Sequence, residues 1–555
     1  MKSKKKFFLA CRYRVLHELG RGGMGIVYLC YDEKTDKHVA LKRIESQRNS
    51  TTKYEQLLIR NRFEQEVQAL ALLNHPTLVR ALDFGQLEDG SFFIVMDVIP
   101  GKSVYEWIIS STLSWKTIWM LVDQVLAGLA HAHARGIIHA DLKPSNILLD
   151  LSHNDKLRAY VLDLGLAWLR SSKPISNTST TPLFPSLGGG TVGWLAPEQI
   201  RGSFTLVGPP TDIYAVGCIV YRLLTGKELF EGEANNVLRA HKREPIPSFE
   251  IPKEVPHEVI PLVKRMLAKK PWHRFQFAAD VRQEWKQMMP SDAVPFEVLI
   301  AKDKKRIQRK EHEFVSPSLS ALLPAPLVGK KRKQDQLLKI AEQVREKREF
   351  GSCMSLLTAK KEGEESRLAE WLCEQVYERG WMETLRAHYT QDSHLTHGVS
   401  DGLVRAVNTY FHLNGADRAL VEQTLIARWE VQPQDRETLN WIAALVEWLR
   451  PTPSGEVAPL TPTAFQTQIQ PQDDCFYTYV ACEVLRRLSQ QRPLLVWIDH
   501  LHLAPPHIFE VLEALAKHTT STRLLVVGTL DNRTHKSNSA LSLFLKKIEK
   551  LWKIY

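Results

Sequence analysis

Polar and apolar residues alternate in three short segments near the start of the chain, and glycines separate these segments. They cover residues 15–19, 26–30 and 38–44. A period of two is typical of half-buried strands, so we expect three antiparallel strands here. The following apolar residues recur at helical spacing, at Phe63, Val67, Leu70 and Leu73. A further short apolar run over residues 92–98 predicts another strand.

The pattern then changes to longer segments with helical spacing. One carries Leu121, Val125, Leu129 and His133, and a second, strongly apolar segment covers residues 213–224. A strand-rich part followed by a helix-rich part predicts an α+β fold of two lobes, a β-rich N-lobe and a helical C-lobe, with a cleft between them.

Composition changes again over residues 286–326, which combine prolines and serines with the basic run 302–310. Such a stretch is typical of an inter-domain linker. We therefore expect a first domain over residues 13–285, preceded by a basic tail at residues 1–12, and a second domain over residues 327–555. A chain of 555 residues also exceeds the size that one hydrophobic core supports.

The formal net charge of +11 is concentrated in two places. Residues 1–10 carry four lysines and no acidic residue, and residues 291–350 carry fourteen Lys and Arg against nine Asp and Glu. The rest is nearly balanced, which indicates solvated tails and argues against a groove for nucleic acid. Seven cysteines without Cys-x-x-Cys spacing favour reduced thiols. Because no apolar run is long enough for a transmembrane segment, we expect a cytoplasmic protein.

The glycine-rich segment 20–27 has the spacing G-x-G-x-x-G-x-V between two predicted strands. Glycine lets the backbone of such a turn close over phosphate groups without a Cβ clash. The motif alone is also compatible with a plain glycine hairpin. A dinucleotide fold is disfavoured, because a strand and not a helix follows the glycines.

Lys42 ends the Val-Ala-Leu-Lys segment of the third predicted strand, where its ammonium group can reach the phosphates of a nucleotide. Glu66, on the following helical segment, is the candidate partner that fixes this ammonium group. A lysine at a strand end is usually just solvated. Lys42 and Glu66 therefore indicate a nucleotide site only together with the motifs around them.

The segment 138–149 carries the groups that phosphoryl transfer requires. Asp141 can accept the proton of an attacking hydroxyl, Lys143 can neutralise the moving phosphoryl group, and Asn146 offers an amide oxygen to a metal ion. Asp163 follows the next short apolar strand, and Mg²⁺ prefers such oxygen ligands.

Further landmarks follow in order. Thr191 precedes Ala-Pro-Glu at residues 196–198, Asp-Ile-Tyr-Ala-Val-Gly occupies residues 212–217, and Arg274 follows. Over residues 13–285 the chain resembles a bacterial eukaryotic-type (Hanks-type) serine/threonine protein kinase. The resemblance implies a non-specific serine/threonine protein kinase that transfers the γ-phosphate of ATP to hydroxyls of protein substrates in signal transduction, with Mg²⁺ as its metal ion.

The resemblance also implies a role for each residue that matches a family motif. Asp141 is the catalytic base, Lys143 assists transfer, and Asn146 and Asp163 bind Mg²⁺. The residues implied in ATP binding are Leu19, Gly20, Gly22, Gly25, Val27, Ala40, Lys42, Glu66, Met96 and Val98. The alternative is a catalytically silent ATP-binding scaffold, which has no chemical reason to keep this set together.

Two positions depart from the family pattern. Leu164 replaces the usual phenylalanine in Asp-Leu-Gly, an apolar change that should still pack. Ala140 stands where most members have an arginine that receives the phosphate of a modified activation segment. We therefore expect that phosphorylation of this segment is not an obligatory switch.

Residues 327–555 contain a second ordered series. Strand, loop and helix over residues 356–368, then an apolar strand ending at Asp499, follow the layout of a P-loop ATPase. The region resembles the STAND/AAA-type ATPase module that often follows such kinases. A further core strand is expected over residues 524–529.

The phosphate-binding chemistry of this second region is lost. Ala359 replaces the first glycine of the loop, Glu364 the second and Glu365 the lysine, so that only Ser366 remains. Carboxylates at these positions repel phosphate. We expect a degenerate ATPase-like α/β domain with an unknown protein partner, and an unrelated α/β or helical domain is the alternative.

Overall fold

The computed structural model describes residues 8–22, 25–44, 60, 63–64, 67–151, 157–162, 168–169, 192–203, 206–301, 316–323, 327, 330–346, 353–359, 363–390, 402–452, 474–517, 522–531 and 539–551. These residues form two compact units, one up to residue 323 and one from residue 327 onward. Among the described residues, no helix is both long and apolar enough to cross a membrane.

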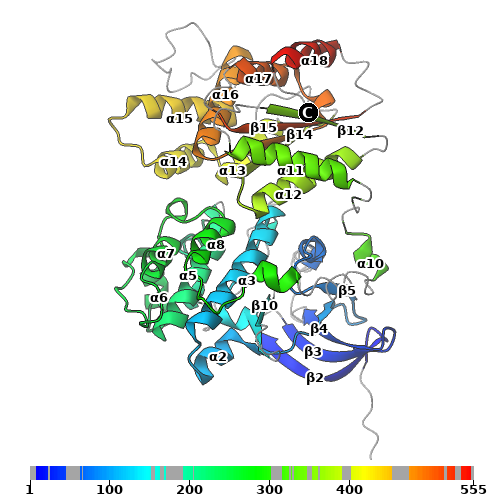
Figure 1. Ribbon diagram of the computed structural model, residues 1–555, viewed down its shortest axis with the longest axis vertical. Helices are drawn as coiled ribbons and strands as arrows, with labels where there is room; N and C mark the ends of the chain where they lie inside the picture. The colour runs from blue at the N-terminus through cyan, green and yellow to red at the C-terminus, as the bar shows by residue number, and fades with distance from the viewer. Residues whose placement is uncertain are drawn as a thin grey trace, which may run out of the picture. The chain divides into compact units, whose positions relative to one another are not determined.

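The first unit begins with a six-stranded antiparallel sheet in the order β1-β2-β3-β4-β6-β5 (Figure 1). Its strands are β1 (Phe8–Leu9), β2 (Tyr13–Gly22), β3 (Gly25–Asp32), β4 (Lys37–Ile44), β5 (Ala81–Gln86) and β6 (Phe92–Asp97). The prediction of three antiparallel strands is confirmed by β2, β3 and β4. Phe63 and Val67 lie on the predicted helix and are buried, whereas Leu73 lies beyond its end.

The C-lobe of this unit is mainly helical. At its centre lie α3 (Trp115–Ala134) and α5 (Pro209–Thr225), the two apolar helices that the sequence predicts. Around them lie α2 (Val104–Ser110), α4 (Pro197–Ile200), α6 (Ala234–Arg243), α7 (Val259–Met266) and α8 (Ala278–Lys286). Trp119 and Trp285 donate their indole N–H groups to each other's backbone carbonyls at 2.9 and 3.0 Å, which fixes α3 against α8.

Short strands flank the segment that carries the predicted catalytic residues. They are β7 (Lys102–Ser103), β8 (Ile137–Ile138), β9 (Ile147–Asp150), β10 (Arg158–Val161) and β11 (Trp168–Leu169), with β10-β9-β7 in one sheet and β11-β8 in another. Residues 139–146 therefore run between β8 and β9. This segment ends in a 3₁₀ turn, Pro144–Asn146, so that both of its ends are anchored by strand pairing.

Part of the predicted linker is folded onto the first unit. Phe296 and Leu299, in a helical stretch at residues 296–301, are buried, as is Leu319 in α10 (Pro317–Ser320). The backbone N–H of Ser316 donates to the Leu82 carbonyl of β5 at 2.9 Å. These stretches of the predicted linker are therefore packed helical segments, and Pro317 stands at the first position of one of them, where proline is favoured.

The second unit is built on a parallel sheet in the order β12-β15-β14-β13. Its strands are β12 (Cys353–Ala359), β13 (Glu383–His388), β14 (Leu494–Asp499) and β15 (Leu524–Asp531). Its helices are α11 (Lys331–Glu346), α12 (Glu364–Glu378), α13 (Gly402–Phe411), α14 (Arg418–Trp429), α15 (Arg436–Leu449), α16 (Asp474–Gln491), α17 (Pro506–Lys517) and α18 (Ser539–Leu551). The predicted strand ending at Asp499 and the strand over residues 524–529 are both present.

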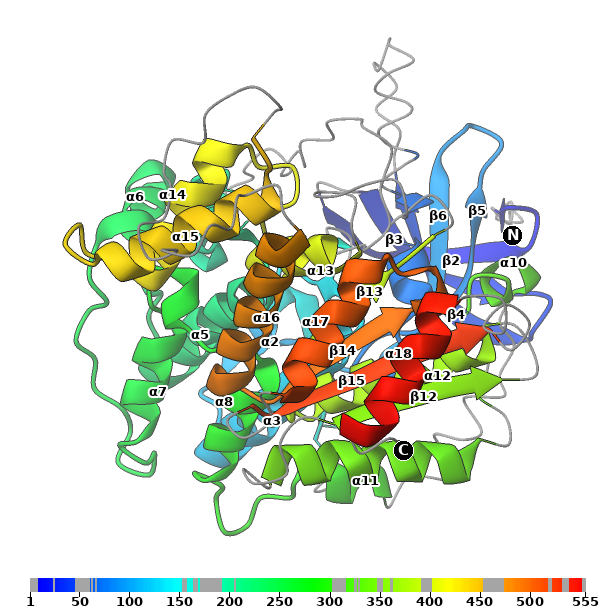
Figure 2. The same ribbon diagram turned by 90° about the horizontal axis from the view of Figure 1, so that it is seen from above.

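Both faces of this sheet are covered by helices, as Figure 2 shows. Leu495 and Trp497 of β14 pack in one core with residues of α11 and α12. Leu494 and Val496, which alternate with them along the strand, pack in a second core with α13, α16, α17 and α18. A parallel sheet that is covered on both faces buries every residue of its strands. This burial explains why β14 is a continuous apolar run.

A buried ion pair joins the segment before α5 to the end of the C-lobe. Arg274 binds Glu198 through two parallel contacts of 2.8 and 2.9 Å, and both side chains are at most 1% exposed. Thr211 donates its hydroxyl to the same carboxylate at 2.8 Å. Both residues are among the landmarks of the sequence resemblance, and the structure pairs them.

We expect Arg274→Met to lower the free energy of unfolding by about 3–5 kcal/mol, because the Glu198 carboxylate stays buried without its cation. Urea unfolding followed by tryptophan fluorescence measures this change. Arg239→Met is the matched control, since its pair with Glu244 is exposed and should contribute less than about 1 kcal/mol. Equal losses in the two variants would contradict the assignment.

Candidate active site

The first turn of α5 places Asp212 in the interior, beneath the predicted catalytic segment. Its Oδ1 accepts the backbone N–H of Ala140 at 2.8 Å. Its Oδ2 accepts the backbone N–H of His139 at 2.9 Å and Nε2–H of His133 at 2.8 Å. Burial alone would raise the pKa of Asp212, but the hydrogen bonds of His133 and Ala140 outweigh burial and lower it. Asp212 therefore acts as a fixed carboxylate that holds the segment.

Ala140 adopts a left-handed backbone conformation, with φ 58°. A residue other than glycine rarely adopts this conformation, because its Cβ approaches the backbone. Two successive N–H groups, those of His139 and Ala140, converge on the Asp212 carboxylate. These hydrogen bonds stabilise the turn that precedes Asp141.

Three of the predicted site residues come together on this loop. Lys143 Nζ lies 2.8 Å from Asp141 Oδ2, and both side chains are largely buried. Asn146 donates Nδ2–H to the backbone carbonyl of Asp141 at 2.8 Å and, less closely, to its Oδ2 at 3.3 Å. Because the amide nitrogen is directed at Asp141, the amide oxygen of Asn146 is the atom that can bind a metal ion.

His139 connects the loop to the strand that leads to Asp163. Its Nε2–H donates to the Leu162 carbonyl at 2.9 Å, which leaves Nδ1 to accept the backbone N–H of Asp141 at 3.3 Å. The Leu162 N–H donates to the Asn146 carbonyl at 2.8 Å. Asp163 itself and Glu66 lie outside the described residues, so their predicted positions stay predictions.

Three positioning residues escaped the sequence reasoning. Gln199 donates Nε2–H to the Ala140 carbonyl at 2.7 Å and accepts the Ala196 N–H at 3.0 Å. His133 binds Asp212 from α3, and His139 was given no role although it lies inside the motif. The position of Gln199 directly after Ala-Pro-Glu was the one available signal for it.

The predicted nucleotide-binding residues of the N-lobe lie on neighbouring strands. Gly22 pairs with Gly25 at the turn between β2 and β3. Gly25 has φ 139°, and a Cβ there would lie 2.0 Å from the Arg43 carbonyl oxygen, so the position requires glycine. Gly20 meets no such restriction, because nothing lies within 4 Å of a Cβ built there.

The other predicted nucleotide-binding residues follow from the register of these strands. Lys42 of β4 is opposite Val27 of β3, and Ala40 is opposite Met96 of β6. Lys42 and Ala40 are buried. Leu19 and Val98, by contrast, are large apolar side chains that are 50% and 36% exposed. The sheet thus places Lys42, Val27, Ala40 and Met96 on paired strands. Leu19 and Val98 add exposed apolar side chains.

The second unit has its own polar cluster at the end of β14. Ser366, in the first turn of α12, donates its hydroxyl to Asp499 Oδ1 at 2.6 Å, and Thr529 of β15 donates to the same oxygen at 2.7 Å. His388 Nδ1 lies 2.8 Å from Asp499 Oδ2. Burial alone would raise the pKa of Asp499, but the hydrogen bonds of His388, Ser366 and Thr529 outweigh it and lower the pKa.

Two carboxylates lie at the start of α12. Glu364 pairs with Lys330 at 2.7 Å. Glu365 is buried, and its Oε2 has no hydrogen-bond partner among the described residues. Ala359 ends β12. Two carboxyl groups therefore lie at the helix start where a P-loop would bind phosphate.

Comparison with known proteins agrees with the geometry of the first unit. Residues 13–286 match the protein kinase domain family. Serine/threonine-protein kinase PrkC of Bacillus subtilis is 34% identical over 284 residues, which cover 51% of this chain and 41% of that protein. Serine/threonine-protein kinase pkn3 of Myxococcus xanthus is 37% identical over 228 residues, which cover 41% of this chain and 40% of that protein.

A third relative shows the same extent of similarity. The probable serine/threonine-protein kinase PknB of Lactococcus lactis is 33% identical over 334 residues, which cover 59% of this chain and 49% of that protein. The chain thus spans half or less of the length of these relatives. Residues 13–286 thus match the protein kinase domain family, are similar in sequence to these bacterial serine/threonine-protein kinases, and contain a loop whose geometry agrees with the match.

Proposed function

We propose that the whole chain is a serine/threonine protein kinase that transfers the γ-phosphate of ATP to hydroxyls of protein substrates. One observation carries the proposal. Asp141, Lys143 and Asn146 converge on a loop that is fixed by the buried Asp212 carboxylate. Phosphoryl transfer requires positioned charges more than covalent chemistry, and this loop supplies them.

Each residue of the loop has a chemical task in this proposal. The Asp141 carboxylate orients the attacking hydroxyl and accepts its proton. Lys143, which contacts Asp141, brings an ammonium group to the transferring phosphoryl group and offsets its charge. The backbone at Gly25 can approach phosphates closely because no Cβ intervenes, and Lys42 binds the phosphates from the neighbouring strand.

The residues present fit Mg²⁺ and ATP. The amide oxygen of Asn146 and the carboxylate of Asp163 are hard oxygen ligands of the kind that Mg²⁺ prefers. When bound, Mg²⁺ neutralises charge on the phosphate oxygens. Leu19, Val27, Ala40, Met96 and Val98 supply apolar surface for the adenine ring, and Glu66 orients Lys42.

A catalytically silent ATP-binding scaffold is the second candidate function. A scaffold needs the nucleotide-binding residues of the sheet but gains nothing from Lys143 beside Asp141. The paired arrangement of these two side chains at 2.8 Å therefore favours the enzyme. A cytoplasmic location and a part in signal transduction, both expected from the sequence, belong to the same proposal.

For the second unit we propose a degenerate P-loop ATPase-like domain of the STAND/AAA type that binds a protein partner. Its support is the order of strand β12 and helix α12 in a parallel sheet, with the Ser366 hydroxyl hydrogen-bonded to Asp499 at the end of β14, two strands away from β12. The buried Glu365 carboxylate opposes phosphate binding, so the domain should not turn over ATP.

We expect Lys42→Met and Asp163→Asn each to reduce phosphoryl transfer by about a hundredfold or more, because each removes a charge aimed at the phosphates or the metal ion. Transfer of label from ATP to a serine/threonine peptide library, with Mg²⁺ as the only metal, measures this. Lys37→Met, at the exposed start of the same strand, is the control and should retain activity. Near-wild-type transfer in either test variant would refute the assigned mechanism.

A chain inactivated by Asp141→Asn should hydrolyse no ATP above background, since Ala359, Glu364 and Glu365 of the second unit replace the two glycines and the lysine of a P-loop. Release of inorganic phosphate over hours measures this. Hydrolysis that disappears on adding Ser366→Ala would show that the second unit is a working ATPase, and it would leave the kinase proposal untouched.

A further inference from the structure

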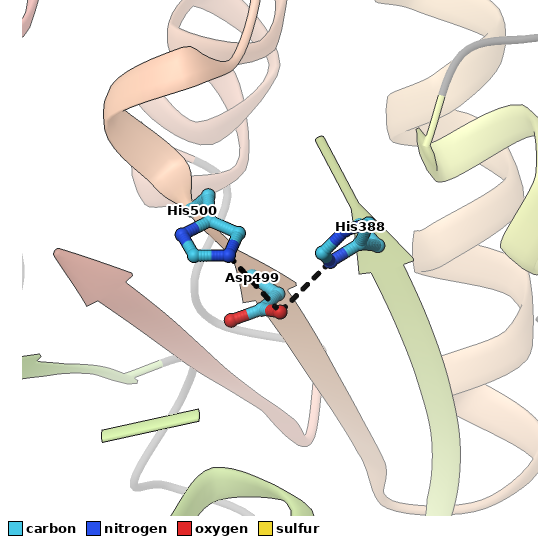
Figure 3. Close-up of side chains that lie close together, drawn as sticks. All are labelled: His388, Asp499 and His500. Carbon is cyan, nitrogen blue, oxygen red and sulfur yellow. Dashed lines mark hydrogen bonds and ion pairs between the residues drawn. The ribbon is translucent and has the colours of Figure 1, made fainter. Parts of the chain in front are cut away.

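Three side chains of the second unit gather at the carboxyl ends of two neighbouring strands (Figure 3). His388 ends β13 and Asp499 ends β14, and the two residues are direct partners in the parallel register. Side chains of paired residues lie on the same face of a sheet. The carboxyl edge of a parallel sheet is where open α/β proteins bind their ligands.

His500 joins this pair because the chain turns immediately after β14. Successive residues of a strand point to opposite faces, so residue 500 would normally face away from residue 499. His500 instead adopts the left-handed conformation, with φ 54° and ψ 49°. Its N–H donates to the Thr529 hydroxyl at 3.0 Å, which holds the turn. His500 Nε2 consequently lies 3.8 Å from Asp499 Oδ2.

We propose that His388, Asp499 and His500 bind a divalent transition-metal ion of the Zn²⁺ class. Their candidate ligand atoms lie within 4.8 Å of one another. Metal–ligand bonds of about 2.0–2.1 Å place tetrahedral donors roughly 3.4 Å apart. Small movements of the two imidazoles, whose side chains are 47% and 34% exposed, bring the donors to that spacing.

The carboxylate is arranged so that one oxygen remains for the metal. Oδ1 of Asp499 accepts the hydroxyls of Ser366 and Thr529, while Oδ2 faces the two imidazoles. Hydrogen bonds of this kind orient ligating carboxylates in metal sites. In the structure, Nδ1–H of His388 donates to Oδ2 of Asp499. A metal ion can bind at Nδ1 only when the hydrogen of the neutral ring is on Nε2.

The donor set selects the class of metal. Two imidazole nitrogens and one carboxylate oxygen suit Zn²⁺, Co²⁺ or Ni²⁺, whereas Mg²⁺ and Ca²⁺ require mostly oxygen ligands. Three protein ligands also leave a fourth position of a tetrahedral site open to water or to another ligand. This site is separate from the Mg²⁺ site proposed in the kinase domain, since its ligands all lie in the second unit.

Titration of the full, chelator-treated chain with Co²⁺ tests the proposal, because tetrahedral Co²⁺ with nitrogen ligands absorbs visible light. We expect one equivalent with this absorption, which Zn²⁺ displaces and excess Mg²⁺ does not. His388→Ala and His500→Ala should each weaken this binding at least about tenfold and remove the absorption. Both side chains are partly exposed, so the variants should keep the thermal midpoint of the wild type without metal.

His257→Ala, which changes an exposed histidine of the first unit, is the control and should bind Co²⁺ like the wild type. Ser366→Ala should retain the stoichiometry but bind about tenfold more weakly, because it acts through the orientation of Asp499. Equal Co²⁺ binding by wild type, His388→Ala and His500→Ala would place the metal elsewhere among the 20 histidines and seven cysteines and overturn the proposal. Absence of the visible absorption in the wild type would overturn it as well.

Discussion

The loop of the candidate active site, residues 139–146, depends on one buried carboxylate. Asp212 is 1% exposed, and an ion at that depth is tolerated only when hydrogen bonds compensate for its lost hydration. The compensating donors are His133 and the backbone of His139 and Ala140. Fold and site are therefore coupled here: the packing of α3 against α5 buries the charge, and the charge in turn dictates the path of the backbone into Asp141.

The same helical turn also anchors α4. Thr211, adjacent to Asp212, donates to Glu198, which pairs with Arg274. Gln199, adjacent to Glu198, donates to the carbonyl of Ala140. Hydrogen bonds and single peptide links thus form a closed circuit through the catalytic loop, α4 and the start of α5. Because the polar groups of this circuit are buried together, a change at one position leaves other polar groups without hydrogen-bond partners. The circuit therefore favours a single arrangement of the loop.

The sequence alone predicted those parts of the structure that have a local signature. Strand alternation located β2 to β4, and motif spacing singled out Asp141, Lys143 and Asn146, whose side chains lie together on one loop. Contacts between distant residues had no such signature: Gln199 meets a carbonyl 59 residues away, and His133 meets a carboxylate 79 residues away. The packed helix at Pro317 had no such signature either, because composition cannot distinguish a proline that starts a short packed helix from a proline in an extended linker.

The second unit illustrates how the carboxyl edge of a parallel sheet can carry different chemistry. The carboxyl edge of the parallel sheet keeps the Ser366–Asp499 hydrogen bond, which in a P-loop protein would place a hydroxyl and a carboxylate beside a nucleotide-bound metal ion. Glu365 places a carboxyl group at the helix start where a P-loop protein binds phosphate, while His388 and His500 bring imidazoles to the Asp499 carboxylate. In the proposed degenerate ATPase-like domain, a weaker affinity for anions and the additional nitrogen donors act in the same direction. Both changes make the site less suited to a phosphate group with Mg²⁺ and more suited to a softer cation. Glu365, His388 and His500 are therefore best explained together.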